Sequence, residues 1–221
     1  RLQAKSPSGA LGPWQFIKPT ANRFLLKTED KIDDRYDFLK ATEAALQYLS
    51  VLYKMFQDWP LALAAYNCGE GRLQRAIQEQ GVKDYFQLAL PEETERYVLR
   101  IAAAKVILQD PAQYGYTIPA AELYPPLQFD EVEFTTDRDL PLRRVAEVCG
   151  STHKKIRRLN PRVQTAVLPP GVYRLYLPAG TAPRFYEAYL RGQLLAGLPP
   201  PSTSAAVGAA HPGPPQSNNN K

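Results

Sequence analysis

Three short segments within the first hundred residues combine aromatic, amide and carboxylate side chains in a way that suits sugar binding. They span residues 6–16, 64–71 and 93–98. An aromatic ring offers a flat apolar face to a sugar, and a planar amide can hydrogen-bond to hydroxyl or acetamido groups. Each segment alone also fits a structural role, as a loop with a buried tryptophan, a helix end or a well-capped helix. Together they predict one groove between helices.

The segment 6–16 is predicted to form a tight loop that leads into a helix. Gly9 and Gly12 lie three residues apart and permit a sharp turn with close backbone approach. We expect Trp14 and Gln15 to start the following helix and to face the groove.

The segment 64–71 places Tyr66 and Asn67 at the end of a helix and Glu70 in the glycine-flanked turn behind it. Glu70 could act as a proton donor, since it is the carboxylate of this segment. It could also be a solvated carboxylate at the start of the next helix, where the helix dipole favours negative charge. We favour the second interpretation.

The elements that must hold these segments are helices. Residues 37–58 carry apolar side chains three or four positions apart, which predicts one buried helix face. These side chains are Ala45, Tyr48, Leu49, Leu52 and Phe56. A short apolar helix is predicted over 59–67, and Leu73, Ala76 and Ile77 indicate another after the turn.

Pro91 opens the strongest predicted helix, which Pro111 stops. Its first turn is acidic and therefore suits the positive end of the helix dipole. One face is predicted to continue through Tyr97, Val98, Ile101, Ala102, Lys105 and Leu108.

The sequence period changes after a proline-containing connector over 116–126. Leu127 and Phe129, then Val132 and Phe134, alternate in two different phases, which predicts a strand broken by a turn or bulge. Two short helices and a second strand follow, so the predicted order is β-α-α-β. The helices contain Leu142 to Cys149 and Ile156 to Leu159, and the strand covers 172–177. From about residue 198 the composition cannot form a core, which predicts a disordered tail.

Composition excludes several classes of protein. The 221 residues carry a net charge of +5, two histidines and two cysteines. No apolar run approaches the roughly 20 residues needed to cross a bilayer. No metal-ligand spacing is present, we expect no cofactor, and a Ser-His or Cys-His hydrolase lacks its partner motif. We expect Cys68 and Cys149 to be buried free thiols.

A basic run covers residues 153–158. Such a run is usually a solvated helix face, although contact with a polyanion such as the cell wall stays open. No aromatic residues interleave with it, which disfavours nucleic acid as a partner.

The three segments, in this order and at these spacings, resemble the lytic transglycosylases of the goose-type lysozyme superfamily, specifically the membrane-bound D-like branch. Residues 33–37, 41–45 and 56–59 resemble the same branch. The resemblance covers residues 1–115 almost continuously. It departs from the family at Pro13, where leucine is usual.

The resemblance implies a one-carboxylate mechanism on peptidoglycan. A glutamic acid protonates the glycosidic oxygen between N-acetylmuramic acid and N-acetylglucosamine, and the muramic C6 hydroxyl closes a 1,6-anhydro ring. This glutamate precedes the segment Ala4-Lys5-Ser6 in the family, so we expect it just upstream of Arg1 and expect the 221-residue piece to be inactive. The substrate-binding residues implied by the resemblance are Gln15, Tyr66, Asn67, Glu70 and Tyr97.

Residues 127–190 resemble a divergent LysM module. Val145-Ala146 corresponds to its first helix, Leu159-Asn160-Pro161 to its Leu-x-x-Asn segment, and 168–178 to its closing strand. Arg138 stands where a glycine is usual. Binding of N-acetylglucosamine by this module and a purely structural role therefore both stay open.

The predicted fold is a mainly α lysozyme-like helical domain, then a small α+β (βααβ) LysM-like domain and a disordered tail. The predicted boundaries are 1–115 for the transglycosylase (SLT) domain, truncated at its N-terminus, 116–126 for the connector, 127–190 for the LysM-like module and 191–221 for the Pro/Ser/Asn-rich tail. The predicted function is a peptidoglycan lytic transglycosylase. The alternatives are a goose-type lysozyme-like hydrolase and a non-catalytic peptidoglycan-binding protein.

The predicted partners are peptidoglycan glycan strands, with no nucleic acid and no metal. We expect a monomer in the periplasm or cell envelope. Anchoring to a membrane through residues upstream of Arg1, and association with the outer membrane, stay open.

Overall fold

The computed structural model describes residues 3–200 and divides into two compact units. The helical unit contains Ala4–Leu26 and Phe38–Pro126. Within the described residues, the mixed unit contains Gln3, Lys27–Asp37 and residues 127–200. The predicted combination of a helical domain with a small α+β domain is confirmed.

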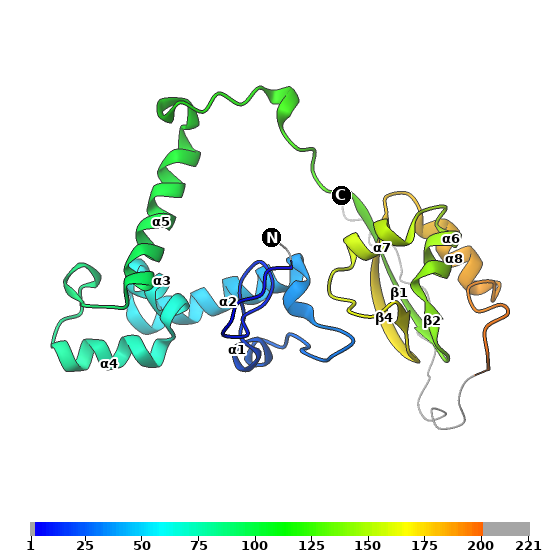
Figure 1. Cartoon of the computed structure of the whole chain (residues 1–221), viewed down its shortest axis with the longest axis horizontal. Coiled ribbons are helices and arrows are strands. Elements are labelled where there is room, and N and C mark those ends of the chain that lie inside the picture. The colour runs from blue at the N-terminus through cyan, green and yellow to red at the C-terminus, as the bar shows by residue number, and fades with distance from the viewer. Residues whose placement is uncertain (1–2, 201–221) are drawn as a thin grey trace, which may run out of the picture. The chain divides into compact units, whose positions relative to one another are not determined.

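The helical unit is built from five α-helices joined by loops and short 3₁₀ turns (Figure 1). The helices are α1 Lys18–Arg23, α2 Phe38–Phe56, α3 Trp59–Cys68, α4 Glu70–Gln80 and α5 Glu92–Gln109. The 3₁₀ turns of this unit are Tyr85–Gln87, Pro111–Tyr114 and Ala120–Glu122.

Local sequence signals set several of these helix ends. The Asp58 side chain accepts a hydrogen bond from the Leu61 N–H at 2.8 Å and caps the start of α3. Gly69 has φ +89°, a conformation that favours glycine, and separates α3 from α4. The chain therefore turns sharply between Asn67 and Glu70, two of the predicted site residues.

The core of the helical unit lies on the predicted face of α2. Ala45, Tyr48, Leu52 and Phe56 are buried there, and they pack with α3, whose Leu61 is fully buried. This prediction is confirmed for these four residues, whereas the fifth predicted residue, Leu49, is only partly buried and lies outside the core.

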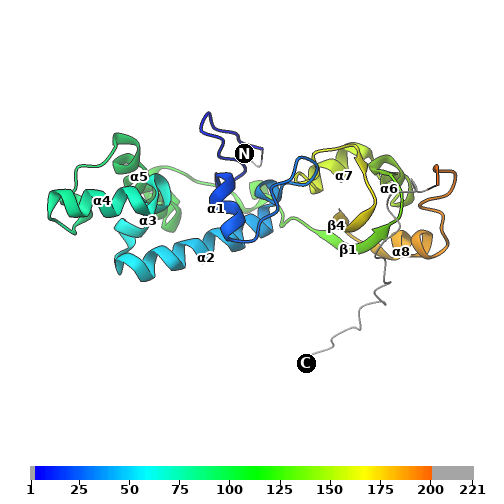
Figure 2. The ribbon, with the colours of Figure 1, turned by 90° about the horizontal axis from the view of Figure 1, so that it is seen from below.

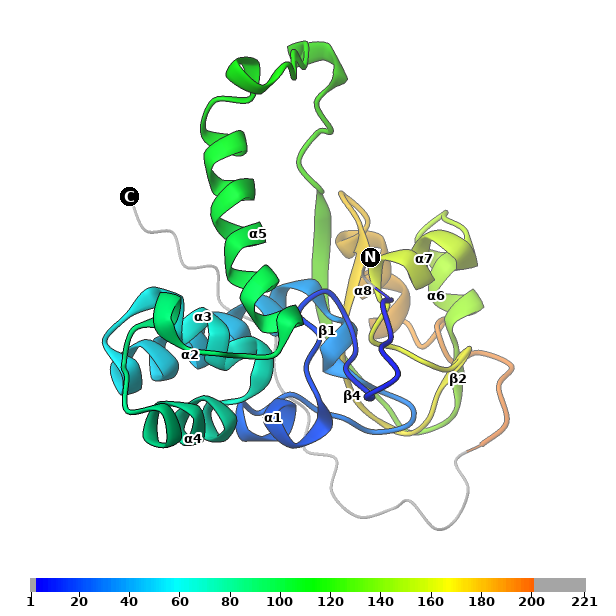
Figure 3. The same ribbon diagram turned by 60° about the vertical axis from the view of Figure 1, so that its left-hand side comes forward.

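The predicted apolar face of α5 is wrong in its second half. Val98 is buried, but Leu108 is 76% exposed and Ala102 and Lys105 are also exposed. Only the first turns of α5 pack on α3, and the rest of the helix extends away from α2, α3 and α4 (Figure 3). Apolar spacing alone does not say how much of a helix has a neighbour.

The expected helix start at Trp14 and Gln15 is also wrong. Gln15 has φ +53°, and Leu11 pairs with Phe16 in an isolated antiparallel bridge, so this stretch is a turn. The helix α1 begins only at Lys18, where Pro19 occupies its first turn.

The mixed unit contains two small antiparallel sheets and three helices (Figure 2). Strand β1 Phe129–Thr136 pairs with β4 Gly171–Pro178, and β2 Leu140–Pro141 pairs with β3 Val167–Leu168. The helices are α6 Leu142–Val148, α7 His153–Leu159 and α8 Ala182–Leu190. The predicted order β-α-α-β is therefore present, with β2, β3 and α8 in addition.

The predicted break in the first strand is wrong. The register between β1 and β4 runs without interruption from Phe129 opposite Pro178 to Thr136 opposite Gly171. Val132 and Phe134 face the core, whereas Phe129 packs on Tyr176, with the ring centres 4.7 Å apart. Phe129 is apolar because it pairs with Tyr176 outside the core, and this made the apolar alternation along the strand look interrupted.

The first residues of the segment predicted as a tail pack on the mixed unit. Leu194 is 1% exposed, and Leu195 and Leu198 contact the same core. The remainder of the predicted tail, residues 201–221, lies outside the described residues.

The segment Lys27–Asp37 is an integral part of the mixed unit. Ile32 lies in its core and forms an isolated bridge with Val163. The Asp33 N–H donates to the Arg162 carbonyl at 2.9 Å, and the Arg162 guanidinium donates to the Asp34 carboxylate at 2.8 Å in a buried ion pair.

Both cysteines are free. Cys149 is buried, as expected, whereas Cys68 is only half-buried.

Candidate functional site

Tyr66, near the end of α3, is the centre of the predicted site. Its hydroxyl donates to the Trp14 carbonyl at 3.0 Å. Its ring lies 5.2 Å from that of Tyr48 and 6.3 Å from that of Phe16, between centres. Burial raises the pKa of Tyr66 above its usual range, so the hydroxyl stays protonated at neutral pH.

Gln15 stands on the turn that Tyr66 holds in place. Its side-chain Nε2 donates to the Gly12 carbonyl at 2.6 Å and to the Ala4 carbonyl at 3.4 Å, and the residue is exposed. The neighbouring Trp14 indole donates to the Thr42 hydroxyl on α2 at 2.7 Å. The loop is therefore attached to both α2 and α3, and Gln15 lies on its exposed side.

Asn67 and Tyr97 connect α3 to the first turns of α5. The Thr94 hydroxyl donates to Oδ1 of Asn67 at 2.8 Å, which leaves the Asn67 amide nitrogen to act as a donor. Tyr97 is half-buried against the same core as Tyr66. Burial also raises the pKa of Tyr97.

Glu70 is held by two donors at the start of α4. The Tyr48 hydroxyl donates to one carboxylate oxygen at 2.6 Å, and the Arg23 guanidinium donates to the other at 2.6 Å. Burial alone would raise the pKa of Glu70, but these hydrogen bonds outweigh it and lower the pKa. Glu70 is therefore ionised at neutral pH and is poorly suited to donate a proton.

All five residues predicted to bind substrate thus lie on the helical unit, around Tyr66. Three supporting residues were not predicted to belong to the site: Arg23, Tyr48 and Thr94. Tyr48 carried a usable signal, since a tyrosine on a buried helix face needs a hydrogen-bond partner for its hydroxyl. Arg23 and Thr94 carried none, because their partners are distant in sequence.

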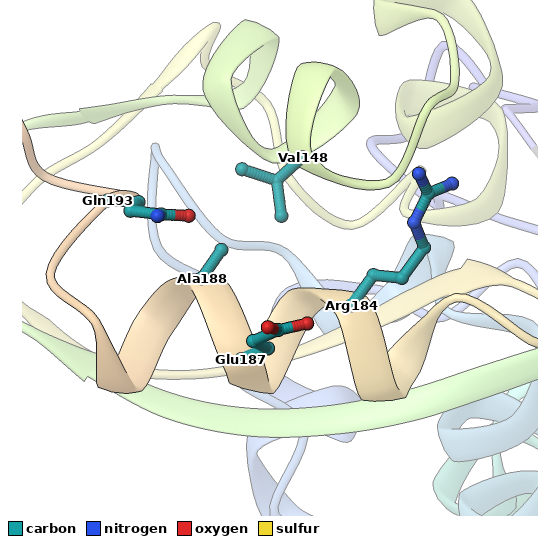
Figure 4. A pocket seen from close by; sticks show the side chains of 5 residues that line it. All are labelled: Val148, Arg184, Glu187, Ala188 and Gln193. Carbon is teal, nitrogen blue, oxygen red and sulfur yellow. The ribbon is translucent and has the colours of Figure 1, made fainter.

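Two surface hollows lie in the mixed unit. One, of about 220 Å³, lies between α6 and α8, where Val148 faces Ala188 beside Arg184 (Figure 4). The other, of about 920 Å³, borders α7. None of the five predicted residues lines either hollow.

Two further features concern the described part of the chain. Residues 3–200 hold no group of three or more His, Cys, Asp or Glu side chains that could bind a metal ion. Within the same residues no helix is both long and apolar enough to cross a bilayer.

Known proteins resemble this sequence along most of its length. The membrane-bound lytic murein transglycosylase D of Escherichia coli K12 is 31% identical over 199 residues, which are 87% of this chain and 43% of that protein. The protein of the same name from E. coli O6:H1 gives the same values. A protein of Alteromonas sp. (strain M-1), whose name refers to tributyltin chloride resistance, is 41% identical over 75 residues. The chain spans less than half the length of the E. coli relatives.

Two family models match separate parts of the sequence. The Transglycosylase SLT domain matches residues 2–88, which include Gln15, Tyr66, Asn67 and Glu70. The model named "Lytic transglycosylase MltD, LysM-like domain" matches residues 128–193. This chain therefore belongs to the lytic transglycosylases of the murein transglycosylase D branch, with an SLT domain followed by the LysM-like domain of that branch.

Proposed function

We propose that the helical unit binds a glycan strand of peptidoglycan and that the full-length gene product cleaves it as a lytic transglycosylase. The bond cleaved is the β-1,4 bond between N-acetylmuramic acid and N-acetylglucosamine. A carboxylic acid gives its proton to the glycosidic oxygen, the muramic C6 oxygen bonds to C1, and the C6 hydroxyl proton returns to the carboxylate. The product carries a 1,6-anhydro ring and no water is consumed.

The observation that carries the proposal is the convergence of the three predicted segments on Tyr66. The 6–16 loop is bonded to Tyr66 through Trp14, and α5 is bonded to the neighbouring Asn67 through Thr94. These residues can bond sugar hydroxyl and acetamido groups without adding charge. The Asn67 amide nitrogen can donate, and the Tyr66 hydroxyl oxygen and the Gln15 amide oxygen can accept, because their own donors already bond backbone carbonyls.

Within this proposal Gln15, Tyr66, Asn67 and Tyr97 contact the sugar. Glu70 has a different role, because an acid for this reaction needs a raised pKa and the pKa of Glu70 is lowered. Its carboxylate accepts the hydrogen bond of the Tyr48 hydroxyl and connects the start of α4 to α2. The proton donor is thus a carboxyl group other than Glu70.

Product analysis tests the reaction type. The full-length gene product is incubated with purified peptidoglycan in heavy-oxygen water, and the soluble fragments are analysed by mass spectrometry. Anhydro ends without heavy oxygen are expected. Reducing ends that contain heavy oxygen would indicate a hydrolase instead, and the absence of any cleavage would indicate a binding protein.

A matched pair of variants tests the site. Gln15 and Gln57 both have positive φ, 53° and 56°, and both donate from Nε2 to the carbonyl three residues earlier. Replacement by alanine therefore leaves a residue with positive φ and removes this hydrogen bond in both turns. We expect Gln15→Ala to lose about tenfold in cleavage rate, equivalent to one hydrogen bond to substrate, and Gln57→Ala to lose little. Equal losses would remove Gln15 from the site.

The same proposal places the protein in the bacterial envelope, where peptidoglycan lies. Support comes from the names of the E. coli relatives, which are membrane-bound murein transglycosylases. We propose that it acts as a monomer. Fractionation of cells and light scattering of the purified gene product test these two points.

A further inference from the structure

The mixed unit has a cluster of unpaired positive charges on α7. Lys154, Lys155 and Arg158 are exposed and form no ion pair with any residue between 3 and 200. Their spacing of one, three and four residues places them on one side of the helix. We call these three side chains the α7 cationic cluster.

Three other exposed arginines of this unit behave differently. Arg143 pairs with Glu147, Arg174 with Glu131 and Glu133, and Arg191 with Glu187. Nearby acids thus balance the charge of these three arginines. The α7 cationic cluster has three such charges close together without a paired acid among the described residues, and it attracts anions over roughly 8–10 Å at physiological salt.

The α7 cationic cluster borders a hollow of about 920 Å³. Its wall is partly apolar, because Leu127, Leu159 and Pro161 line it beside the three cations. The volume falls in the range typical of sites for small organic molecules and is far larger than a single inorganic ion needs. A ligand with several anionic groups on a partly apolar frame suits such a surface.

We infer that this hollow binds the carboxylates of the short acidic peptides that peptidoglycan carries on its glycan strands. The peptides bring several carboxylates a few ångströms apart together with apolar side chains, which matches both the charge and the lining of the hollow. A bilayer surface fits less well, because the apolar residues line a hollow. This inference adds a second, peptide-directed contact to the proposed glycan site of the helical unit.

The test compares binding to two forms of the same wall. Purified insoluble peptidoglycan is used either native or after its carboxylates have been converted to amides, which removes the charge and leaves the glycan intact. The full-length gene product is sedimented with each form over a range of concentrations. The variant K154Q/K155Q/R158Q is compared with the matched control R143Q/R174Q/R191Q, which removes three exposed positive charges from the same unit.

We expect the variant to bind native peptidoglycan about tenfold more weakly than the parent, since each exposed charge contact contributes a fraction of the binding free energy. The control should bind within about twofold of the parent. On amidated peptidoglycan the parent, the variant and the control should bind alike. Parent binding to the native form should also weaken as salt is raised, which tests the inference without any substitution.

Three results would overturn the inference. The variant could bind native peptidoglycan as well as the control does, its defect could persist on the amidated form, or the parent could prefer phosphatidylglycerol vesicles to peptidoglycan. Binding to the amidated form reports the glycan site separately. Loss of that binding alone would refute the proposed function and leave the inference standing.

Discussion

Removal of one hydroxyl group tests whether the network around Glu70 holds the helical unit together. Tyr48→Phe keeps the buried ring but deletes the donor that lies 2.6 Å from the Glu70 carboxylate. A hydrogen bond to a charged group contributes about 1.5–3 kcal/mol. The Glu70 side chain is 27% exposed and retains Arg23, so we expect the lower end, about 1.5 kcal/mol less free energy of unfolding at neutral pH.

The effect should depend on pH with a defined sign. The pKa of Glu70 is lowered in the folded protein, so its contribution is complete above the ordinary carboxyl pKa of 4.5. The contribution is lost as the pH falls below 4.5 and through the lowered value of the folded state. The difference between Tyr48→Phe and the parent should therefore shrink at about pH 3.5.

Urea unfolding followed by tryptophan fluorescence measures this difference in the free energy of unfolding for the helical unit. The two tryptophans, Trp14 and Trp59, both belong to the helical unit. Tyr114→Phe is the control, because Tyr114 is 47% exposed and its hydroxyl makes no hydrogen bond within residues 3–200. Equal stability of Tyr48→Phe and Tyr114→Phe at neutral pH, or a difference that does not change with acid, would refute the reasoning.

Two further predictions concern a buried ion pair and two buried tyrosine hydroxyls. Arg162→Met should lower the free energy of unfolding of the mixed unit by about 3–5 kcal/mol, because the Asp34 carboxylate loses the buried guanidinium that pairs with it. Thermal unfolding followed by circular dichroism measures this loss, and a loss below about 1 kcal/mol would contradict the prediction. At alkaline pH, stability should fall as the pH rises above 10, because the pKa values of Tyr48 and Tyr66 are raised in the folded protein. Urea unfolding at about pH 9 and 11 tests the second, and Tyr66→Phe should reduce the fall.

Periodic elements of the fold could be predicted from the sequence because local patterns determine them. The core face of α2 follows from the spacing of Ala45, Leu52 and Phe56, and this face is buried. The start of α5 follows from Pro91 and the acidic turn behind it. Each of these features depends on residues within a few positions of one another.

Elements that depend on distant partners could not be predicted. The 6–16 loop has the glycines of a turn, but its attachment to the helical unit depends on Thr42 of α2 and Tyr66 of α3. Helix α8 was not predicted. It is held in place by hydrogen bonds between the hydroxyls of Tyr186 and Tyr189 and the backbone of β1, which is distant in sequence. Spacing within one segment carries no information about such partners.

The position of the site follows from the same distinction. Gln15, Asn67 and Glu70 were recognisable as polar residues at loops and helix ends, where backbone turns expose side chains. The orientation of Asn67 and Glu70 depends instead on Thr94 and Tyr48, two buried residues that resemble ordinary helix residues in the sequence. Substitution of Tyr48 or Thr94 should therefore disturb binding without removing a group that touches the sugar.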